Sequence, residues 1–96
     1  MQDDEFEWDD PKAEANLRKH GVSFVAAGRI FDDIFSIDWS HWTTDEGEVR
    51  YMITGIVDGV LLTAVYTERN NRTRIISARR ATNHERQEYY RSKTPG

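Results

Sequence analysis

The stretch Val65–Ala81 reads Val-Tyr-Thr-Glu-Arg-Asn-Asn-Arg-Thr-Arg-Ile-Ile-Ser-Ala-Arg-Arg-Ala. Its beginning is typical of a strand, Asn70-Asn71 is a turn signal, and Thr73–Ala78 is rich in β-branched and apolar residues. We therefore predict a β-hairpin. It carries the arginines Arg69, Arg72, Arg74, Arg79 and Arg80.

These arginines allow two interpretations. A guanidinium group is always charged, and its planar fork fits phosphate oxygens, so arginines held on a rigid sheet would form a phosphate-binding surface. Alternatively, they are the solvated charges of a strand edge, which discourage aggregation. The residues alone leave both interpretations open.

The second strand of this hairpin covers Arg72–Arg80. Three further strands are predicted before it. Val49–Val57 and Val60–Thr67 flank Asp58-Gly59, which is a strong signal for a two-residue hairpin turn. Val60–Thr67 is apolar at nearly every position, so we expect a central strand. Ile34–Trp39 alternates with a period of two, which favours a strand with one wet face. Strands joined by short turns form an antiparallel meander.

An acidic polar loop, Ser40–Glu48, separates the strand Ile34–Trp39 from the strand Val49–Val57. Trp42 lies within it and is expected to fold back onto the core. The alternative is an exposed contact residue.

Two helices are predicted near the N-terminus. The first covers Pro11–His20, with Asp10 as its cap and Gly21 as its stop. The second covers Phe24–Phe31 and begins after Ser23, another capping residue. Both have apolar residues at helical spacing, so each needs a partner surface.

A last helix is predicted from Thr82 to about Tyr90 or Arg91, because Thr82-Asn83-His84-Glu85 fits a capping box. Phe6 and Trp8 alternate with acidic residues, a pattern that also allows a short strand there. The fold class is then α+β, with the order α-α-β-β-β-β-α. Two N-terminal helices pack on a four-stranded antiparallel meander sheet, and a C-terminal helix packs at its edge or end.

The composition fits a single domain over residues 1–96, with residues 1–5 and 92–96 expected to fray. The chain has no cysteine, which excludes disulfides and thiolate zinc sites. We expect no metal and no cofactor, because the three histidines are scattered and have no metal-ligand spacing. We also expect no membrane contact, since no apolar run is long enough to span a bilayer and the acidic N-terminus is unlike a signal peptide. A cytoplasmic protein is therefore expected.

Charge is distributed unevenly along the chain. The net charge is −4, but residues 1–48 hold 4 basic and 13 acidic groups, whereas residues 49–96 hold 9 basic and 4 acidic groups. Such asymmetry suggests that the second half contacts a polyanion, although the two halves could simply neutralise each other.

Two long motifs carry a family resemblance. The first consists of Phe6–Asp9, Pro11-Lys12, Asn16–Phe24 and Phe31–Asp33. The second consists of Val65–Arg69, Arg74–Thr82, Glu85-Arg86 and Tyr89. Together they resemble the opening and closing signatures of BrnT-type toxins, over about residues 5–91.

This resemblance implies a RelE-like fold and an RNA-cleaving toxin of a bacterial type II toxin–antitoxin system that blocks translation. The implied partner is a BrnA-like antitoxin with a ribbon-helix-helix region. Operator DNA would be contacted through that antitoxin, and the complex could contain a toxin dimer. We expect the antitoxin to cover the arginine surface or its rim, with Trp42 or Trp39 as an anchor.

Metal-free RNA cleavage needs a base for the ribose 2′-OH, cations for the phosphate and an acid for the leaving oxygen. The catalytic candidates are Arg80, Arg74, Arg79, Glu68 and His20. The RNA-binding candidates are Arg69, Arg72 and Tyr89. Strand alternation predicts that Arg80 and Arg74 share one face while Arg79 lies on the other.

Each of these roles has a structural alternative. Glu68 could pair with an arginine, His20 could cap its helix, and Tyr89 could pack against the sheet. The whole chain could also be a non-catalytic module that binds nucleic acid or protein through the same arginines, or a purely protein-binding domain.

Overall fold

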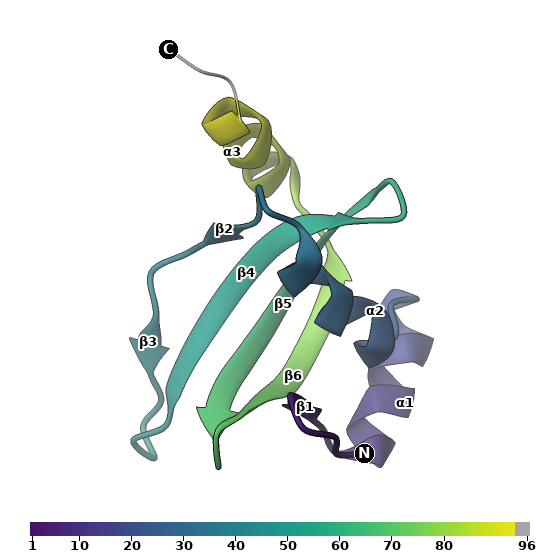
Figure 1. Ribbon diagram of the computed structural model, residues 1–96, viewed down its shortest axis with the longest axis vertical. Helices are drawn as coiled ribbons and strands as arrows, with labels where there is room; N and C mark the ends of the chain where they lie inside the picture. The colour runs from purple at the N-terminus through teal and green to yellow at the C-terminus, as the bar shows by residue number, and fades with distance from the viewer. Residues whose placement is uncertain (94–96) are drawn as a thin grey trace.

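The computed structural model describes residues 1–93 (Figure 1). Its helices are α1 (Asp10–His20), α2 (Phe24–Arg29), the 3-10 turn η1 (Ile30–Asp32) and α3 (Asn83–Lys93). Its strands are β1 (Phe6–Glu7), β2 (Ile37–Asp38), β3 (Trp42–Thr43), β4 (Val49–Val57), β5 (Val60–Arg69) and β6 (Arg72–Arg80).

The strands form one mixed sheet in the order β1-β6-β5-β4-β2, with β3 paired to the start of β4. β4, β5 and β6 are the predicted antiparallel meander, and both hairpin turns, Asp58-Gly59 and Asn70-Asn71, have positive φ at both residues. β1 adds to the edge of β6 in the parallel direction, with Phe6 opposite Thr73. The prediction of a purely antiparallel four-stranded sheet is therefore wrong. Helices and strands intervene between β1 and β6, so no short turn forces them to run antiparallel.

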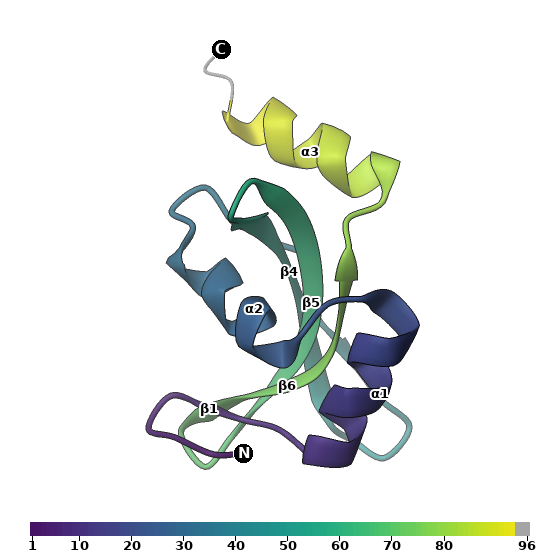
Figure 2. The same cartoon turned by 90° about the vertical axis from the view of Figure 1, so that its right-hand side faces the viewer.

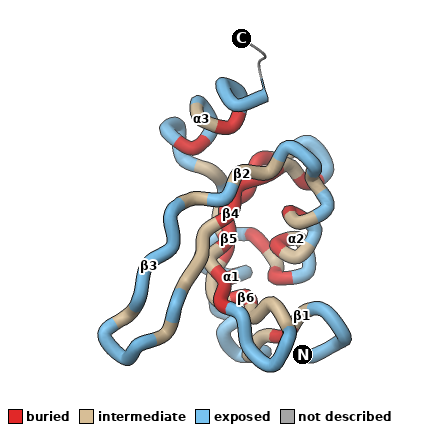
Figure 3. Tube along the Cα trace, turned by 60° about the vertical axis from the view of Figure 1, so that its left-hand side comes forward, coloured by how far each residue is buried: buried red, intermediate tan, exposed pale blue. Residues whose placement is uncertain are grey.

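The segment between η1 and β4 is less regular than predicted. The backbone N–H of Phe35 donates to Asp33 Oδ1 at 2.9 Å, which favours a turn and leaves Ile34 88% exposed. Pairing is limited to β2 and β3 in this region. Figure 3 shows the β3 segment extending away from the buried elements. Trp42 is accordingly 41% exposed, so the prediction that it folds onto the core is wrong.

The two N-terminal helices form where predicted, with one shift. Asp9 rather than Asp10 caps α1, because Asp9 Oδ2 accepts from the Lys12 backbone N–H at 3.1 Å. Ser23 caps α2 as expected, and Gly21 ends α1 in the left-handed conformation at φ 70°. Glycine adopts this left-handed conformation at the end of a helix without steric cost, because it has no Cβ atom.

The core lies between α2–η1 and one face of the sheet (Figure 2). Phe24, Ala27 and Ile30 are at most 2% exposed there. We call this sheet surface, which carries Leu62, Ala64 and Tyr66 of β5, the helical face. The opposite surface, which carries Thr63, Val65 and Thr67, is the open face. Successive side chains alternate between the two faces along a regular strand.

α1 lies along the edge of β6, beyond the point where β1 ends. The buried Asn16 side chain donates to the Ala78 carbonyl at 2.8 Å and accepts from the Ala78 N–H at 3.2 Å. It also donates to the Val22 carbonyl. A side-chain amide thus replaces a neighbouring strand at this edge, whose backbone groups would otherwise be unpaired.

α3 packs across one end of the sheet. Its capping box forms as predicted: the Glu85 N–H donates to Thr82 Oγ1, and the Thr82 N–H donates to Glu85 Oε1. Further along, the hydroxyl of fully buried Tyr89 donates to Asp33 Oδ2 at 2.6 Å. The same oxygen accepts from the Ile56 N–H, so Asp33 ties α3 to β4.

The N-terminal residues are held by several contacts. The Met1 amino group bonds the Trp8 carbonyl at 2.9 Å and Asp10 Oδ1 at 3.0 Å, and Asp3 Oδ1 accepts from the Phe6 N–H. At the other end, residues 92 and 93 belong to α3. Residues 94–96, also expected to fray, lie outside the described residues. Within residues 1–93, no helix is long and apolar enough to cross a membrane.

Candidate functional site

A β-bulge in β6 decides where the arginines point. Val65 lies opposite Ser77 and Tyr66 lies opposite Ile75, so Ile76 has no partner in β5. An extra residue of this kind reverses the alternation of side chains along its strand. Ile75 and Ala78, which are three positions apart, can therefore both lie in the core.

Two arginines that were expected on different faces consequently share one. Arg74 is opposite Thr67 and Arg79 is opposite Thr63, and both threonines belong to the open face. Arg80 is opposite Leu62 on the helical face. The prediction that Arg80 and Arg74 share a face is therefore wrong, because the bulge falls between them.

A cleft at the open face gathers basic side chains from four elements, α1, β4, β5 and β6. We call it the basic cleft; its volume is about 160 Å³. It is lined by Asp9, Lys12, Glu48, Arg50, Thr67, Arg69, Arg74, Ile75 and Ile76. Its four cations exceed its two carboxylates, so it is electropositive.

Arg69 is the least neutralised of the predicted residues in this cleft. It is exposed and forms no ion pair with any residue in 1–93. Arg74 donates to Glu7 Oε2 at 2.7 Å, and Arg50 donates to Glu48 Oε1 at 3.0 Å. Arg69 therefore has the guanidinium group most available to an added anion.

A larger cleft of about 560 Å³ adjoins the basic cleft at the end of β4 and β5. We call it the end cleft. It shares Glu48, Thr67 and Arg69 with the basic cleft, and Glu68 and Tyr51 also line it. Glu68 forms no ion pair in the described chain, so the alternative in which it pairs with an arginine is not observed.

A row of aromatic rings crosses the sheet behind the end cleft. Successive ring centroids are 5.0–5.8 Å apart from Phe31 through Tyr66 and Tyr51 to His41. Burial, and then the charges of Asp38 and Glu68, raise the pKa of Tyr66 to about 12. Tyr66 therefore keeps its proton at neutral pH. The exposed His41 ends the row against Tyr51, which lines the end cleft.

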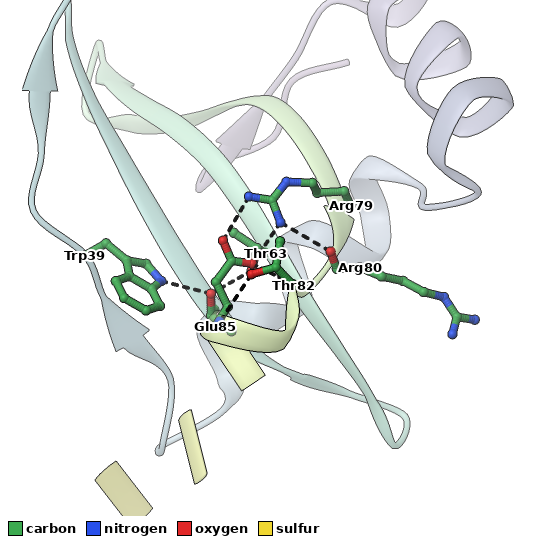
Figure 4. A network of polar contacts seen from close by, with 7 residues as sticks. Trp39, Thr63, Arg79, Arg80, Thr82 and Glu85 are labelled. Carbon is green, nitrogen blue, oxygen red and sulfur yellow. Dashed lines mark hydrogen bonds and ion pairs between the residues drawn. The ribbon is translucent and has the colours of Figure 1, made fainter. Parts of the chain in front are cut away.

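Arg79 lies in a buried polar network rather than in either cleft (Figure 4). It donates to both oxygens of Glu85 at 2.8 and 2.9 Å. Thr63 Oγ1 also donates to Glu85 Oε1 and lies 2.6 Å from Thr54 Oγ1, which accepts from the Trp39 indole. This network joins β4, β5, β6 and α3, so it positions α3 on the sheet.

The charge of Glu85 is strongly favoured in this setting. Burial alone would raise the pKa of Glu85, but hydrogen bonds from Arg79, the Thr82 amide and Thr63 outweigh it and lower the pKa to about 2. Hydrogen bonding to Glu85 in turn raises the pKa of Arg79. Both groups therefore stay ionised, as a buried pair must if it is to persist.

The remaining predicted site residues lie apart from the clefts. The Arg72 side chain donates to the Asp3 carbonyl at 2.6 Å, and His20 is exposed at the end of α1. Tyr89 is fully buried and its hydroxyl donates to Asp33, which favours the alternative in which it packs against the sheet over a contact with RNA. Arg80 points away from Arg79 in Figure 4.

Three residues of the site were missed from the sequence: Lys12, Arg50 and His41. Arg50 could have been found, because the Asp58-Gly59 turn fixes the register of β4 on β5 and places Arg50 near Thr67. Lys12 and His41 carry no such signal, since they come from a helix and a loop whose placement is tertiary.

Metal ligands are not grouped in the described part of the chain: within residues 1–93, no set of three or more His, Cys, Asp or Glu side chains could hold a metal ion. The clefts offer fixed guanidinium charge beside carboxylates, and His41 packs against Tyr51 in the wall of the end cleft. That combination suits an anionic ligand with exchangeable protons.

Comparison with known protein families gives a match over most of the chain. The sequence model of a family described as "Ribonuclease toxin, BrnT, of type II toxin-antitoxin system" matches residues 8–85. These residues include all that line the basic cleft and the end cleft. No curated protein matches the chain.

Proposed function

Because this chain belongs to the BrnT family of ribonuclease toxins from type II toxin–antitoxin systems, we propose that it cleaves RNA without a metal ion, at the basic cleft and the end cleft. The observation that carries the proposal is the position of Arg69. The guanidinium group of Arg69 has no carboxylate partner in the described chain, and Arg69 lines both clefts where they meet.

The basic cleft supplies the charge that phosphate binding needs. Arg69 and Arg74 would bind the non-bridging oxygens of the scissile phosphate, with Lys12 and Arg50 holding the neighbouring phosphates. Charge-assisted hydrogen bonds of this kind are about twice as strong as neutral ones. They act on the negative charge that builds up as the ribose oxygen attacks phosphorus.

The end cleft supplies the proton-transfer groups. Glu68 would take the proton from the ribose 2′-OH, which attacks phosphorus to give a 2′,3′-cyclic phosphate. His41, starting as the imidazolium, would then protonate the departing 5′-oxygen, which leaves as a 5′-hydroxyl. Proton exchange with water afterwards restores the carboxylate of Glu68 and the imidazolium, so atoms and charge balance with no metal or cofactor. The support for this assignment is that Glu68 lines the cleft beside Arg69, and that His41 contacts Tyr51 in its wall.

Arg79 and Arg80 have other roles in this proposal. Arg79 is a positioning residue that holds α3, and Arg80 lies on the helical face. Arg72 would bind RNA beyond the scissile phosphate, because it shares the open face with Arg69. His20 would have no catalytic part.

The proposed biology follows from the family. RNA cleavage would block translation in the bacterial cytoplasm, and an antitoxin would neutralise it. We propose a BrnA-like ribbon-helix-helix antitoxin, through which the complex would contact operator DNA.

The test is RNA cleavage by the purified chain in EDTA. We expect wild-type protein to cut RNA in chelator and Arg69→Ala to lower the rate by about 100-fold, as for loss of one transition-state donor. Arg91→Ala is the matched control, because Arg91 is an exposed arginine of α3 paired with Glu88. Cleavage that needs added metal, or an equal loss in both variants, would refute the mechanism.

A non-catalytic binding module is the second candidate. It is favoured by the ion pairs of Arg74 and Arg79, which leave less free charge for catalysis than the sequence suggests. RNA that is bound by folded protein but remains intact after long incubation would support it.

A further inference from the structure

A second surface, on the helical side of the sheet, is not used by the proposed chemistry. Two adjoining clefts of about 180 and 320 Å³ share Leu17 and Ser23 and form one groove between α1 and α2. Trp8 and Val25 line its first part, and Val60 and Leu62 line its second part. We call it the α1–α2 groove.

Apolar side chains are unusually accessible in this groove. Leu17 is 49% exposed and Val25 is 63% exposed. Leu17 follows the buried Asn16 on α1, and Val25 lies between the buried Phe24 and Ala27 on α2, so both stand on helices that are anchored to the fold. Contiguous exposed apolar surface of this kind marks interaction sites.

The rim of the groove is positive. Arg80 lines the second part and has no carboxylate partner in residues 1–93, while Arg18 and Lys19 end α1 nearby. Asp58 also lines this part, but both its oxygens are bonded to Arg29, at 2.7 and 2.9 Å. Glu14, in the first part, is the remaining acid of the lining.

We infer that the α1–α2 groove binds an acidic, amphipathic segment of the antitoxin, with apolar side chains between Leu17 and Val25 and a carboxylate on Arg80. The inference takes from the proposed function only that an antitoxin exists. The charge of the rim selects an acidic partner, and an exposed arginine that a partner would desolvate beside apolar pockets is typical of an interface hot spot.

This assignment separates recognition of the antitoxin from recognition of RNA. Arg80 and Leu62 are on the helical face, whereas Arg69 and Arg74 are on the open face. Antitoxin affinity and RNA cleavage should therefore respond to different substitutions.

The experiment measures the affinity of the full chain for the antitoxin of its own operon by titration calorimetry. The variants are Val25→Asp and Arg80→Glu. An acid at position 25 lies in the first turn of α2, where the helix dipole tolerates negative charge, so folding should be kept. Ile34→Asp is the matched control, because Ile34 is an exposed apolar residue outside the groove. Circular dichroism melts check that all variants fold.

We expect each groove variant to weaken antitoxin binding by about tenfold or more, corresponding to about 1.4 kcal/mol. The control should bind like wild type, and Val25→Asp should cut RNA at the wild-type rate. Unchanged affinity in both groove variants would overturn the inference. It would also be overturned if the groove variants altered only self-association of the chain, or only RNA binding. The affinity readout does not depend on catalysis, so a chain that fails to cleave RNA would refute the proposed function and leave this inference standing.

Discussion

Arg79 binds Glu85 through two N–H···O bonds of 2.8 and 2.9 Å that join β6 to α3. The Glu85 side chain is 8% exposed and also accepts from Thr63, so this pair anchors the last helix on the sheet. An arginine counted as catalytic from the sequence thus has a structural partner.

Removing the carboxylate should destabilise the fold. Glu85→Ala leaves a partly buried guanidinium and a buried hydroxyl without their partner, and we expect the free energy of unfolding to fall by about 3 kcal/mol. Urea unfolding followed by circular dichroism measures it. Glu88→Ala, which removes an ion pair with an exposed arginine on the same helix, should cost less than about 0.5 kcal/mol. Equal effects of the two substitutions would contradict the anchoring role.

The same carboxylate predicts a pH dependence. The pKa of Glu85 is about 2 in the folded chain against 4.5 for the free side chain, so the folded state binds the proton more weakly. Its contribution to stability is therefore complete above pH 4.5 and is lost as the pH falls through about 2. Unfolding measured at pH 5, 4 and 3 should show this loss in wild type and a smaller loss in Glu85→Gln. Parallel curves for the two proteins would count against it.

Much of this fold could be predicted because its signals are local. The turns at Asp58-Gly59 and Asn70-Asn71 and the capping box from Thr82 are short patterns whose chemistry is independent of the rest of the chain. The parallel pairing of β1 depends on a distant segment, so no local pattern reports it.

The candidate site was harder to predict for one main reason. Alternation along Arg72–Arg80 is a sound rule for a regular strand, but the bulge at Ile76 inverts it. Nothing in Ile75-Ile76 indicates which isoleucine pairs and which does not. The rule therefore placed Arg80 with Arg74, although the structure places Arg79 there.

The edge of β6 gives a further prediction. Asn16→Ala would leave both backbone groups of Ala78 without a partner, and we expect a loss of about 2 kcal/mol in the free energy of unfolding. Thermal melts of this variant and of Lys19→Ala, an exposed residue of the same helix, would measure the difference. A melting temperature for Asn16→Ala equal to that of the control would mean that this edge does not need the amide.

The end cleft gives a prediction about proton transfer. If Glu68 is the base, Glu68→Gln should lower the cleavage rate by about 100-fold or more, while RNA affinity is retained or rises. Gel assays of rate and fluorescence anisotropy of an RNA oligonucleotide separate the two quantities. Loss of affinity at an unchanged maximal rate would assign Glu68 to binding instead.

The most direct test compares single-turnover RNA cleavage by Arg69→Ala and Arg80→Ala, with both proteins shown to be folded. Arg69→Ala should lose about 100-fold in rate, and Arg80→Ala should cleave at close to the wild-type rate. The opposite order, with Arg80→Ala inactive and Arg69→Ala active, would place the chemistry beside Arg80, outside both clefts, and contradict the proposed site.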